Sequence, residues 1–447
     1  MRIRAGVALL SLFVLDCAMK PEERYDKMRG MLEQAKYDDA AKFIESGKEK
    51  FYGESNAVLY YLDELMALHL AKRYQESNAL VDKATKRMDD LYTTSVSTEV
   101  GAFMTNDNAK PYEGEDFERA LIHVVGALNY SALGQRDDAL VEARRVEQQL
   151  QVLNDAHSKV KEGKKSEYAE DAFVRWLAGS LYESDGSDEG LNDAWVSYQK
   201  ALQAYEKAYL PKYRTTVPSV LVQDALRVAE RLGFDDEYKA IKRSYPQVSY
   251  PRQAEVAAQG SLVFLHLNGE APYKVEKSWN AIADGKAIRV AYPEFMSKPK
   301  RVAYAVITVA GQTGRTELME NVNAIAIQNL KDHMSRIKGK MIARAIAKFV
   351  AAKATEVAST QASGNQTFGA LMGAAASVAG AVTERADIRS WLLLPSSIDA
   401  SRMYLAPGTY TATVEFFGMG GGALAKKTLP SFTVEKGRTT FLSYRTF

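Results

Sequence analysis

The sequence predicts an α + β multidomain protein, in which an N-terminal α-solenoid is followed by an antiparallel β domain with an inserted helical hairpin. Three observations predict this class. Apolar residues recur at three- and four-residue spacing from Pro21 to about Tyr245, which is typical of amphipathic helices. Short β-rich runs bounded by Gly, Pro and Asn begin after Pro251. Helical spacing returns within the β half. We therefore expect a leader at 1–16, a helical solenoid at 17–250, and a β-sandwich-like domain at 251–447 with a helical insertion at 320–383.

The first residues follow the order of a secretory signal. Two arginines precede an apolar run from Ala5 to Leu15, and these eleven residues span only about 16 Å as a helix, short of the roughly 30 Å core of a bilayer. The run ends at Asp16 and Cys17, the only cysteine in the chain, and it resembles the signal of bacterial lipoproteins. That resemblance implies that Cys17 is acylated after residues 1–16 are removed. The alternative is cleavage elsewhere, with Cys17 incidental.

Five stretches of the helical half share a small turn, then acidic residues, then a helix that contains Ala or an aromatic residue. Their anchor positions, 40, 77, 139, 194 and 238, are 37, 62, 55 and 44 residues apart. The first interval lies near the 34-residue tetratricopeptide period, and the longer ones indicate insertions, such as the polar loops expected at 93–111 and 155–166. Stacked helix pairs of this kind form a solenoid whose concave face usually binds a peptide or protein. The alternative is a solenoid that serves only as a spacer.

Several segments together resemble one protein family. They are Pro111–Arg119, the repeat around Asn129 and Tyr130, Glu142–Arg145, and residues 173–182, 260–276, 321–347 and 383–395. This combination resembles a family of bacterial tetratricopeptide-containing envelope lipoproteins of unknown function. The resemblance implies an envelope protein without an established enzymatic activity. It also implies an association with peptidoglycan synthesis, since members are often encoded beside a lipoprotein that resembles the activator of penicillin-binding proteins.

The first of these segments supplies a candidate protein-binding site. Acidic residues around Gly114 are suited to bind a cation or a basic peptide. Equally, Glu115 and Asp116 are suited to cap a helix that begins at Phe117, because carboxylates are favourable at a helix N-terminus. The residues assigned to the protein-binding surface are Tyr112, Glu113, Glu115, Asp116, Arg119, Asn129, Tyr130, Arg144 and Arg145.

The C-terminal half combines strands with a glycine-rich helix. The β-rich runs include 261–267, 301–310, 405–414 and a strand, turn and strand at 432–442, which suits a small antiparallel sandwich. His266 lies in the middle of the first run without a nearby histidine, so we expect a structural role for it.

The insertion places apolar residues of 320–358 on one helical face, with Lys and Arg opposite. The segment Thr367–Val382 then carries small residues at four-residue spacing, including Gly369, Gly373 and Gly380, which permits close approach of a second backbone. Three interpretations compete: burial against helix 320–358, self-association or docking to another envelope protein, and membrane insertion. The adjacent apolar face favours the first.

Composition and motifs exclude several function classes. Lys+Arg 58 against Asp+Glu 56 gives a net charge of +2, so the chain as a whole does not attract nucleic acid. One cysteine and five separated histidines give no zinc-ligand spacing. No His-Glu-x-x-His or Gly-x-Ser-x-Gly motif occurs. The glycine run 418–422 is expected in a hairpin loop, and 185–190 is no calcium loop because Val196 occupies its twelfth position. We expect no catalytic residue, metal or cofactor.

These observations favour a scaffold in the cell envelope. Ala18 follows the cysteine, which favours an outer-membrane anchor that faces the periplasm. We expect the solenoid groove at about residues 110–245 to bind a periplasmic or outer-membrane protein, with self-association as a further option. The alternative is a cell-wall-glycan-binding module or enzyme in the C-terminal domain, or an accessory factor of peptidoglycan synthesis.

Overall fold

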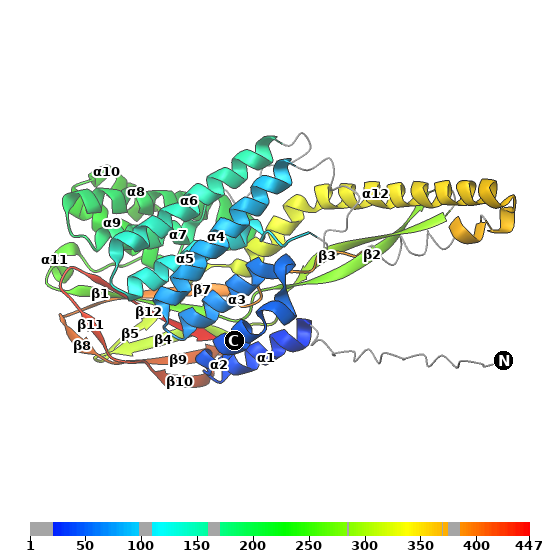
Figure 1. Ribbon diagram of the computed structural model, residues 1–447. Coiled ribbons are helices and arrows are strands. Elements are labelled where there is room, and N and C mark those ends of the chain that lie inside the picture. The colour runs from blue at the N-terminus through cyan, green and yellow to red at the C-terminus, as the bar shows by residue number, and fades with distance from the viewer. Residues whose placement is uncertain (1–20, 98–109, 160–169, 284–285, 369, 374–384) are drawn as a thin grey trace, which may run out of the picture.

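The computed structural model describes residues 21–97, 110–159, 170–283, 286–368, 370–373 and 385–447 (Figure 1). Cys17, and most of the two loops expected at 93–111 and 155–166, lie outside these residues. The N-terminal part is helical. Its α-helices are α1 (Pro21–Glu33), α2 (Tyr37–Ser46), α3 (Ala57–Leu70), α4 (Tyr74–Ser97), α5 (Asp116–Ala132), α6 (Arg136–Lys159), α7 (Ala172–Glu183), α8 (Asp188–Ala204), α9 (Ser219–Leu232), α10 (Asp235–Ser244) and the short α11 (Gln253–Val256).

Three helix pairs, α3–α4, α5–α6 and α7–α8, share one kind of turn. Lys72 (φ +61°), Gly134 (φ +72°) and Gly186 (φ +74°) adopt the left-handed conformation after the first helix of each pair. This conformation ends a helix, and glycine adopts it without steric cost. The acidic residues expected after the turns lie in the first turn of the second helix, such as Glu76 and Asp137, where the helix dipole favours them. The helical N-terminal part that the sequence predicts is therefore present.

Two four-stranded sheets form the C-terminal part. Their strand orders are β12-β1-β7-β6 and β10-β9-β4-β5, while β8 pairs with β11 and β2 forms a long hairpin with β3. The strands are β1 (Gly260–Asn268), β2 (Tyr273–Ala283), β3 (Lys286–Met296), β4 (Val302–Val309), β5 (Gln312–Arg315), β6 (Glu317–Glu320), β7 (Ser397–Leu405), β8 (Gly408–Tyr410), β9 (Ala412–Gly418), β10 (Ala423–Thr428), β11 (Phe432–Val434) and β12 (Thr439–Thr446).

One pairing differs from the antiparallel domain that the sequence predicts. β12 runs parallel to β1, from the Ser261–Thr439 pair to the Asn268–Thr446 pair. The strands on either side of the turn at Gly437 do not pair with each other, since β11 pairs with β8. A parallel pair requires a long crossover, and the chain between β1 and β12 supplies it. The prediction of a purely antiparallel domain is therefore wrong at this edge of the first sheet.

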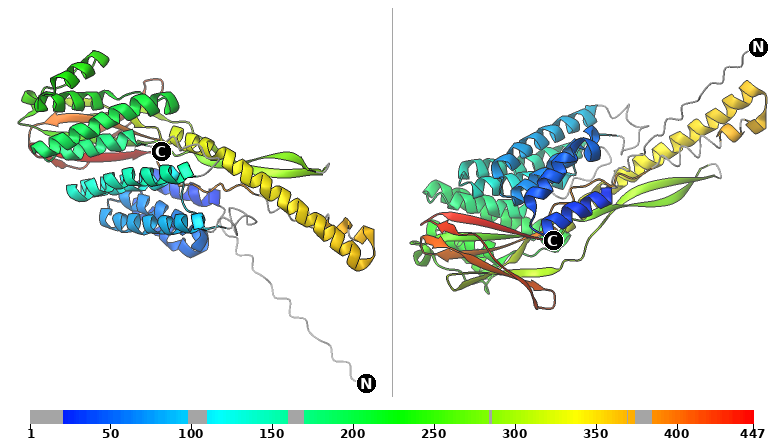
Figure 2. Two further views of the ribbon diagram at one scale, coloured as in Figure 1. Left: turned by 90° about the horizontal axis from the view of Figure 1, so that it is seen from above. Right: turned by 60° about the horizontal axis from the view of Figure 1, so that its bottom comes forward.

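The helices, the first sheet and the second sheet form three layers (Figures 1 and 2). The core between the two sheets contains Leu262, Phe264 and Phe416. The core between the first sheet and the helices contains Val263 and Leu265, because successive side chains of β1 point to opposite faces. β1 is buried along its whole length, which accounts for its largely apolar sequence. The helical and β regions thus share one core.

A long arm leaves this three-layered body (Figures 1 and 2). We define the arm as α12 (Val322–Ser363), the β2–β3 hairpin beside it, and the helical residues 366–368 and 370–373. α12 has 42 residues and is therefore about 63 Å long. The side chain of Asn321 caps its start by accepting a hydrogen bond from the amide of Ala324 (3.1 Å). Val322 and Leu330 bury the base of α12 in the shared core.

The chain turns back at the far end of the arm, as expected for the inserted helical hairpin. α12 ends at Gly364 (φ +63°), and helix resumes two residues later. A Cβ atom at Gly373 would lie 2.7 Å from Cβ of Glu356 in α12, so only glycine permits this approach. This contact joins residue 373 to α12 within the same chain. Gly369 and Gly380 lie outside the described residues.

Candidate functional site

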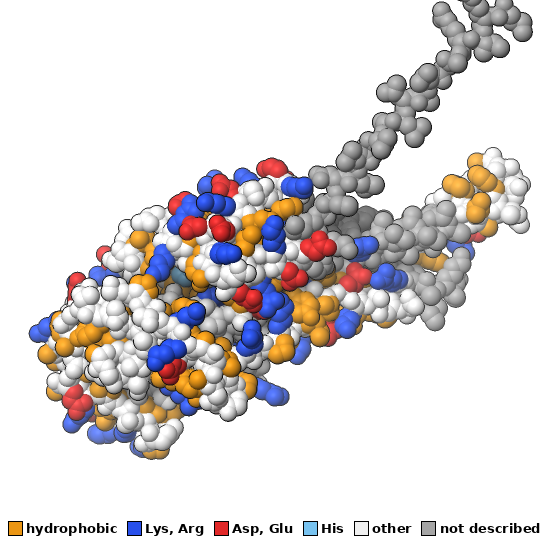
Figure 3. Space-filling view, turned by 90° about the horizontal axis from the view of Figure 1, so that it is seen from below, with side chains coloured by type: hydrophobic (Ala, Val, Ile, Leu, Met, Phe, Trp, Pro, Cys, Tyr) orange, Lys and Arg blue, Asp and Glu red, His pale blue; other side chains and the backbone are white. Residues whose placement is uncertain are grey.

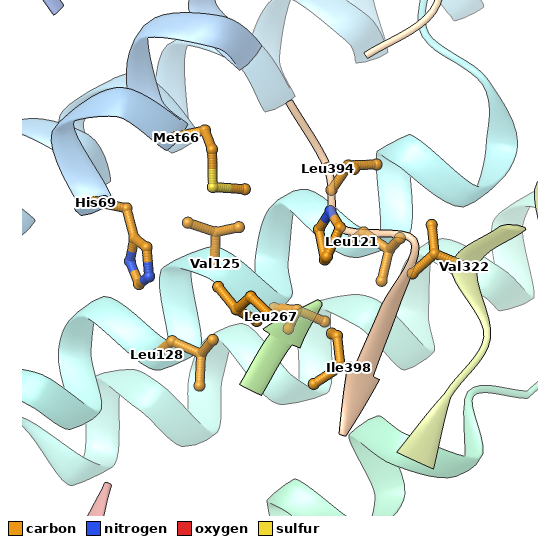
Figure 4. A pocket seen from close by; sticks show the side chains of 11 residues that line it. Met66, His69, Leu121, Val125, Leu128, Leu267, Val322, Leu394 and Ile398 are labelled. Atoms are coloured by element: carbon orange, nitrogen blue, oxygen red, sulfur yellow. The ribbon is translucent and has the colours of Figure 1, made fainter. Parts of the chain in front are cut away.

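A small apolar cavity lies in the shared core, where α3 and α5 meet β1 and β7 (Figure 4). Its volume is about 20 Å³, which is room for about one water molecule. Met66, Val125, Leu267 and Ile398 point into it, and His69 is its one histidine. An apolar gap of this size is a packing feature and holds no ligand.

A much larger groove lies between the turns of the helix pairs and the outer edge of the first sheet. Its volume is about 970 Å³. One wall consists of the α3–α4, α5–α6 and α7–α8 turns, and the other consists of β11, β12 and their connection. We define the groove by these lining residues: Lys72, Tyr74, Ser131, Gly134, Gln135, Arg136, Asp137, Asp138, Ser184, Asp185, Phe432, Thr433, Glu435, Arg438, Thr439, Thr440, Phe441, Leu442 and Ser443.

The helix wall of the groove presents charges of both signs. Arg136 lies 2.9 Å from a carboxylate oxygen of Asp137 and also pairs with Asp185 on the next turn. Hydrogen bonds from Ser187 and Arg136 hold the pKa of Asp185 below its ordinary value, so this carboxylate is ionised at neutral pH. A ligand in the groove therefore meets fixed cations and anions close together.

The strand wall of the groove is the edge strand β12. Ser261 donates to the carbonyl of Arg438 (2.9 Å) and Gly269 donates to that of Thr446 (3.0 Å), so the even-numbered residues of β12 direct their backbone groups towards β1. Backbone groups alternate along a strand, so those of Phe441 and Ser443 point away from the sheet. In the part of the chain that the structure describes, no residue bonds to these outward groups of Phe441 and Ser443. They form an open edge inside the groove.

Ser184 joins the two walls at one end of the groove. Its hydroxyl accepts a hydrogen bond from the amide of Thr439 (3.0 Å), and its carbonyl accepts one from Arg438 (3.0 Å). The first outward amide of β12 is thus already satisfied by a neighbour. Beyond Thr439, Phe441 is half-buried and Ser443 is exposed.

A buried ion cluster behind Ser184 fixes the helices on the sheet. Arg402 of β7 lies 2.6 Å from Asp224 and 3.1 Å from Glu183, and Arg227 lies 2.9 Å from Asp224. The indole of Trp176 donates to the second oxygen of Asp224 (2.9 Å). Burial disfavours the ionised form of Glu183, but Arg227 and Arg402 lower its pKa to about 2. The cluster therefore carries full charges inside the body.

The residues predicted from Tyr112 to Arg119 lie apart from the groove, at a junction inside the molecule. The hydroxyl of Tyr112 donates to Glu118 (2.7 Å), and the other oxygen of Glu118 accepts from the amide of Trp391 (2.6 Å). Glu115 pairs with buried Lys274 of β2. Asp116 accepts a hydrogen bond from Asn329 of α12 (3.3 Å). These contacts connect α5 to the hairpin, to α12 and to the segment before β7.

The capping interpretation of this run describes the structure. Glu115 is the N-cap of α5, and its amide donates to Glu118 at the third helical position (3.1 Å), which forms a capping box. Burial, followed by the nearby charge of Glu115, raises the pKa of Glu118 to about 7. Sequence reasoning missed Glu118 as the centre of the junction. The Glu-x-x-Glu spacing was the available signal, although capping boxes usually begin with Ser or Thr.

The other predicted binding residues do not gather into one surface. Arg119 is buried and donates to the carbonyl of Met88 (3.0 Å), while Glu113 accepts from it through its own carbonyl (3.5 Å). Asn129 is buried and donates to Ser77 (2.9 Å). These side chains are used within the chain, so the prediction of a single binding surface needs correction. Tyr130 is half-buried, exposed Arg144 donates to Tyr182 (2.8 Å), and Arg145 pairs with Glu142 (2.7 Å).

Histidines in the body have structural partners. Nδ1 of His69 lies 2.6 Å from Oδ1 of Asn129, and burial lowers the pKa of His69. Nε2 of His266 lies 2.8 Å from the hydroxyl of Thr446, in accord with the structural role expected from the sequence. Within the described ranges, no three His, Cys, Asp or Glu side chains gather to hold a metal ion.

No protein-family model matches the chain, and no curated protein is significantly similar to it. Among the helices that the structure describes, none is both long enough and apolar enough to cross a membrane.

Proposed function

We propose that the protein is a lipid-anchored scaffold of the bacterial cell envelope, which binds an extended segment of a periplasmic or outer-membrane protein in the groove. The observation that carries this proposal is the open edge of β12 along one wall of the groove. A segment added to an edge strand gains main-chain hydrogen bonds, while its alternate side chains enter neighbouring pockets and provide specificity.

The dimensions and chemistry of the groove suit such a segment. The stretch of β12 that lines it, Thr439–Ser443, is about 16 Å long at roughly 3.3 Å per residue, so a partner of about five residues pairs with it. Arg136 and Asp185 on the opposite wall offer charges of both signs, and Phe432 and Phe441 offer apolar contact. We therefore expect a partner segment that mixes apolar and charged residues.

The location in this proposal rests on the leader and on Cys17. The repeated left-handed turns at Lys72, Gly134 and Gly186 support a tetratricopeptide-like arrangement of the helices. Mass spectrometry of the mature protein should find a diacylated or triacylated Cys17 as the first residue. A free N-terminus at any other position would contradict the lipid anchor.

Proline at Ser443 tests the open edge. The outward amide of Ser443 is unused by the described chain, and proline is tolerated in edge strands at such positions, so Ser443→Pro should fold. The variant removes the amide donor of residue 443, and the proline ring blocks the outer edge of β12. Ser443→Ala is the matched control, because it retains the amide.

We expect the parent and Ser443→Ala to capture the same envelope protein from membrane extracts, and Ser443→Pro to lose it at an unchanged melting temperature. A photo-reactive residue at position 443 should crosslink to that protein, whereas one at exposed Leu424 should not. Equal capture by the proline variant would contradict the proposal. Hydrolysis of purified peptidoglycan by the parent would favour the alternative of a cell-wall enzyme.

A further inference from the structure

The outer half of the arm carries a row of exposed apolar side chains. Ile342, Ile346, Val350 and Val357 of α12 are all exposed, and Val350 is 58% accessible. At about 100° per residue, these four positions lie within roughly 80° of one another around the helix axis. Scattered exposed apolar residues are ordinary on protein surfaces, but several on one face of a projecting helix mark an interaction site.

The stripe continues at the far end of the arm, beyond the turn at Gly364. Phe368, Leu371 and Met372 are exposed there, and Leu371 is 65% accessible. Figure 3 shows hydrophobic side chains gathered at this end of the molecule, well away from the body. The position matters, because a projecting end reaches a broad surface before any part of the body does.

The arm is also strongly basic. Its helical part, residues 322–373, contains seven Lys and Arg against two Asp and Glu, a net charge of +5, whereas the rest of the chain has a net charge of −3. Arg336, Lys340 and Lys348 lie about 120–240° from Ile342 around the helix, outside the apolar stripe, whereas exposed Lys353 lies within it. Two such arms repel each other, which disfavours a second copy as the partner, and the same charge attracts an anionic surface.

We propose that the outer half of the arm binds the surface of an anionic lipid bilayer. The apolar stripe and the end of the arm enter the boundary between headgroups and acyl chains, and the basic residues contact the headgroups. Amphipathic helices with a basic polar face lie in bilayers in this way. No described helix is long and apolar enough to span a bilayer, so the arm rests on the membrane rather than crossing it. This surface is separate from the groove.

Vesicle binding tests the proposal. The chain from Ala18 onward retains every described residue and lacks both the leader and Cys17, so any binding comes from the folded protein. We expect flotation with vesicles of phosphatidylglycerol and phosphatidylethanolamine to show at least tenfold tighter binding than with phosphatidylcholine vesicles. Raising the salt from 0.1 to about 0.5 M should weaken the binding, because screening shortens the reach of the basic residues.

Two double variants locate the binding surface. Val350→Ser with Leu371→Ser should lower binding to the anionic vesicles at least tenfold. Met419→Ser with Leu424→Ser is the matched control, because these side chains are 80% and 55% accessible but lie at the β9–β10 hairpin of the body. The control should bind like the parent. Both variants change only exposed side chains, so neither should alter the thermal unfolding of the protein.

A fluorescent label reports directly whether the end of the arm enters the bilayer. The chain from Ala18 onward contains no cysteine, so Met372→Cys can be labelled at one position. An environment-sensitive dye there should shift to the blue with anionic vesicles, whereas the same dye at Met419→Cys should not. Equal binding to both kinds of vesicle, or unchanged binding of the Val350/Leu371 variant, would overturn the proposal. A dimeric parent that the same variant converts to a monomer would identify a second copy as the occupant and overturn it as well.

Discussion

The body and the arm distribute charged and apolar side chains in opposite ways. In the body, Glu183, Asp224, Arg227 and Arg402 are enclosed between α7, α9 and β7, where each charge has a partner. In the outer arm, the apolar stripe is exposed and the basic residues lie beside it. Charges that hold two layers together need exact partners, whereas charges that meet an external surface need only a common sign. The two regions therefore have different tasks, and substitutions in them should have different costs.

The largest difference should come from Arg402→Ala. This change leaves Asp224 and Glu183 buried with one cation fewer, and breaking a buried ion pair typically costs about 3–5 kcal/mol. Urea unfolding measures the loss. Arg289→Ala is the control, because its pair with Glu276 (2.7 Å) is solvent-exposed and should contribute about 1 kcal/mol or less. Equal losses in the two variants would erase the contrast between buried and exposed charges.

Acid should weaken the body through the same cluster. The pKa of Glu183 is about 2 in the folded protein and near its ordinary 4.5 in the unfolded chain. The folded state therefore binds this proton less readily, so the stabilisation is complete above about pH 4.5 and is lost as the pH falls towards 2. Up to about 3 kcal/mol is involved. Unfolding curves between pH 6 and pH 2.5 should show this loss in the parent, and Glu183→Gln should lack it. If Glu183→Gln lost as much stability in acid as the parent, the acid sensitivity would arise from other groups.

A bulky side chain at the far end of the arm should have a smaller and local effect. Gly373→Leu places atoms where Glu356 already lies, and overpacking of this kind costs about 1–3 kcal/mol. Hydrogen exchange should become faster around residues 356 and 373, while the protein stays monomeric and the amides of β1 keep their protection. Unchanged exchange together with lost assembly would show instead that Gly373 faces another molecule.

The smallest expected effect is a gain at Gly339. A Cβ atom there meets nothing within 4 Å, and alanine is about 0.5–1 kcal/mol more favourable than glycine inside a helix. Gly339→Ala should therefore slow hydrogen exchange along α12. Faster exchange in this variant would indicate that α12 needs a flexible point at residue 339. That would be a further difference between the arm and the body.

Local elements could be predicted from the sequence because periodicity is a local property. The acidic turn before Ala139 correctly indicates a helix pair, and the apolar run around Phe264 correctly indicates a buried strand. Glycines 418–422 lie in the loop between paired strands β9 and β10, as expected. The helical N-terminal part and the C-terminal sheets are confirmed at this level.

Long-range relations could not be predicted in the same way. Nothing near Gly437 indicates that the next strand pairs with β1 in parallel, because that choice depends on which edge remains free. Likewise, Tyr112 and Arg119 are suited by composition to a binding surface, yet the packing of α5 against distant segments buries them. The groove could not be predicted from the sequence either. Its strand wall, β12, lies outside the solenoid to which the sequence assigns binding.

The parallel pairing of β1 with β12 also has a kinetic consequence. Ser261 and Thr439 bond through their hydroxyls although they are 178 residues apart, and such distant contacts make folding slow. The helices form early from local contacts, but the sheet that covers their apolar side closes late. During that interval the apolar side of the helices is exposed to water, and such exposed surface makes a folding intermediate prone to aggregation. The slowest step of its maturation should therefore be the meeting of these two remote strands.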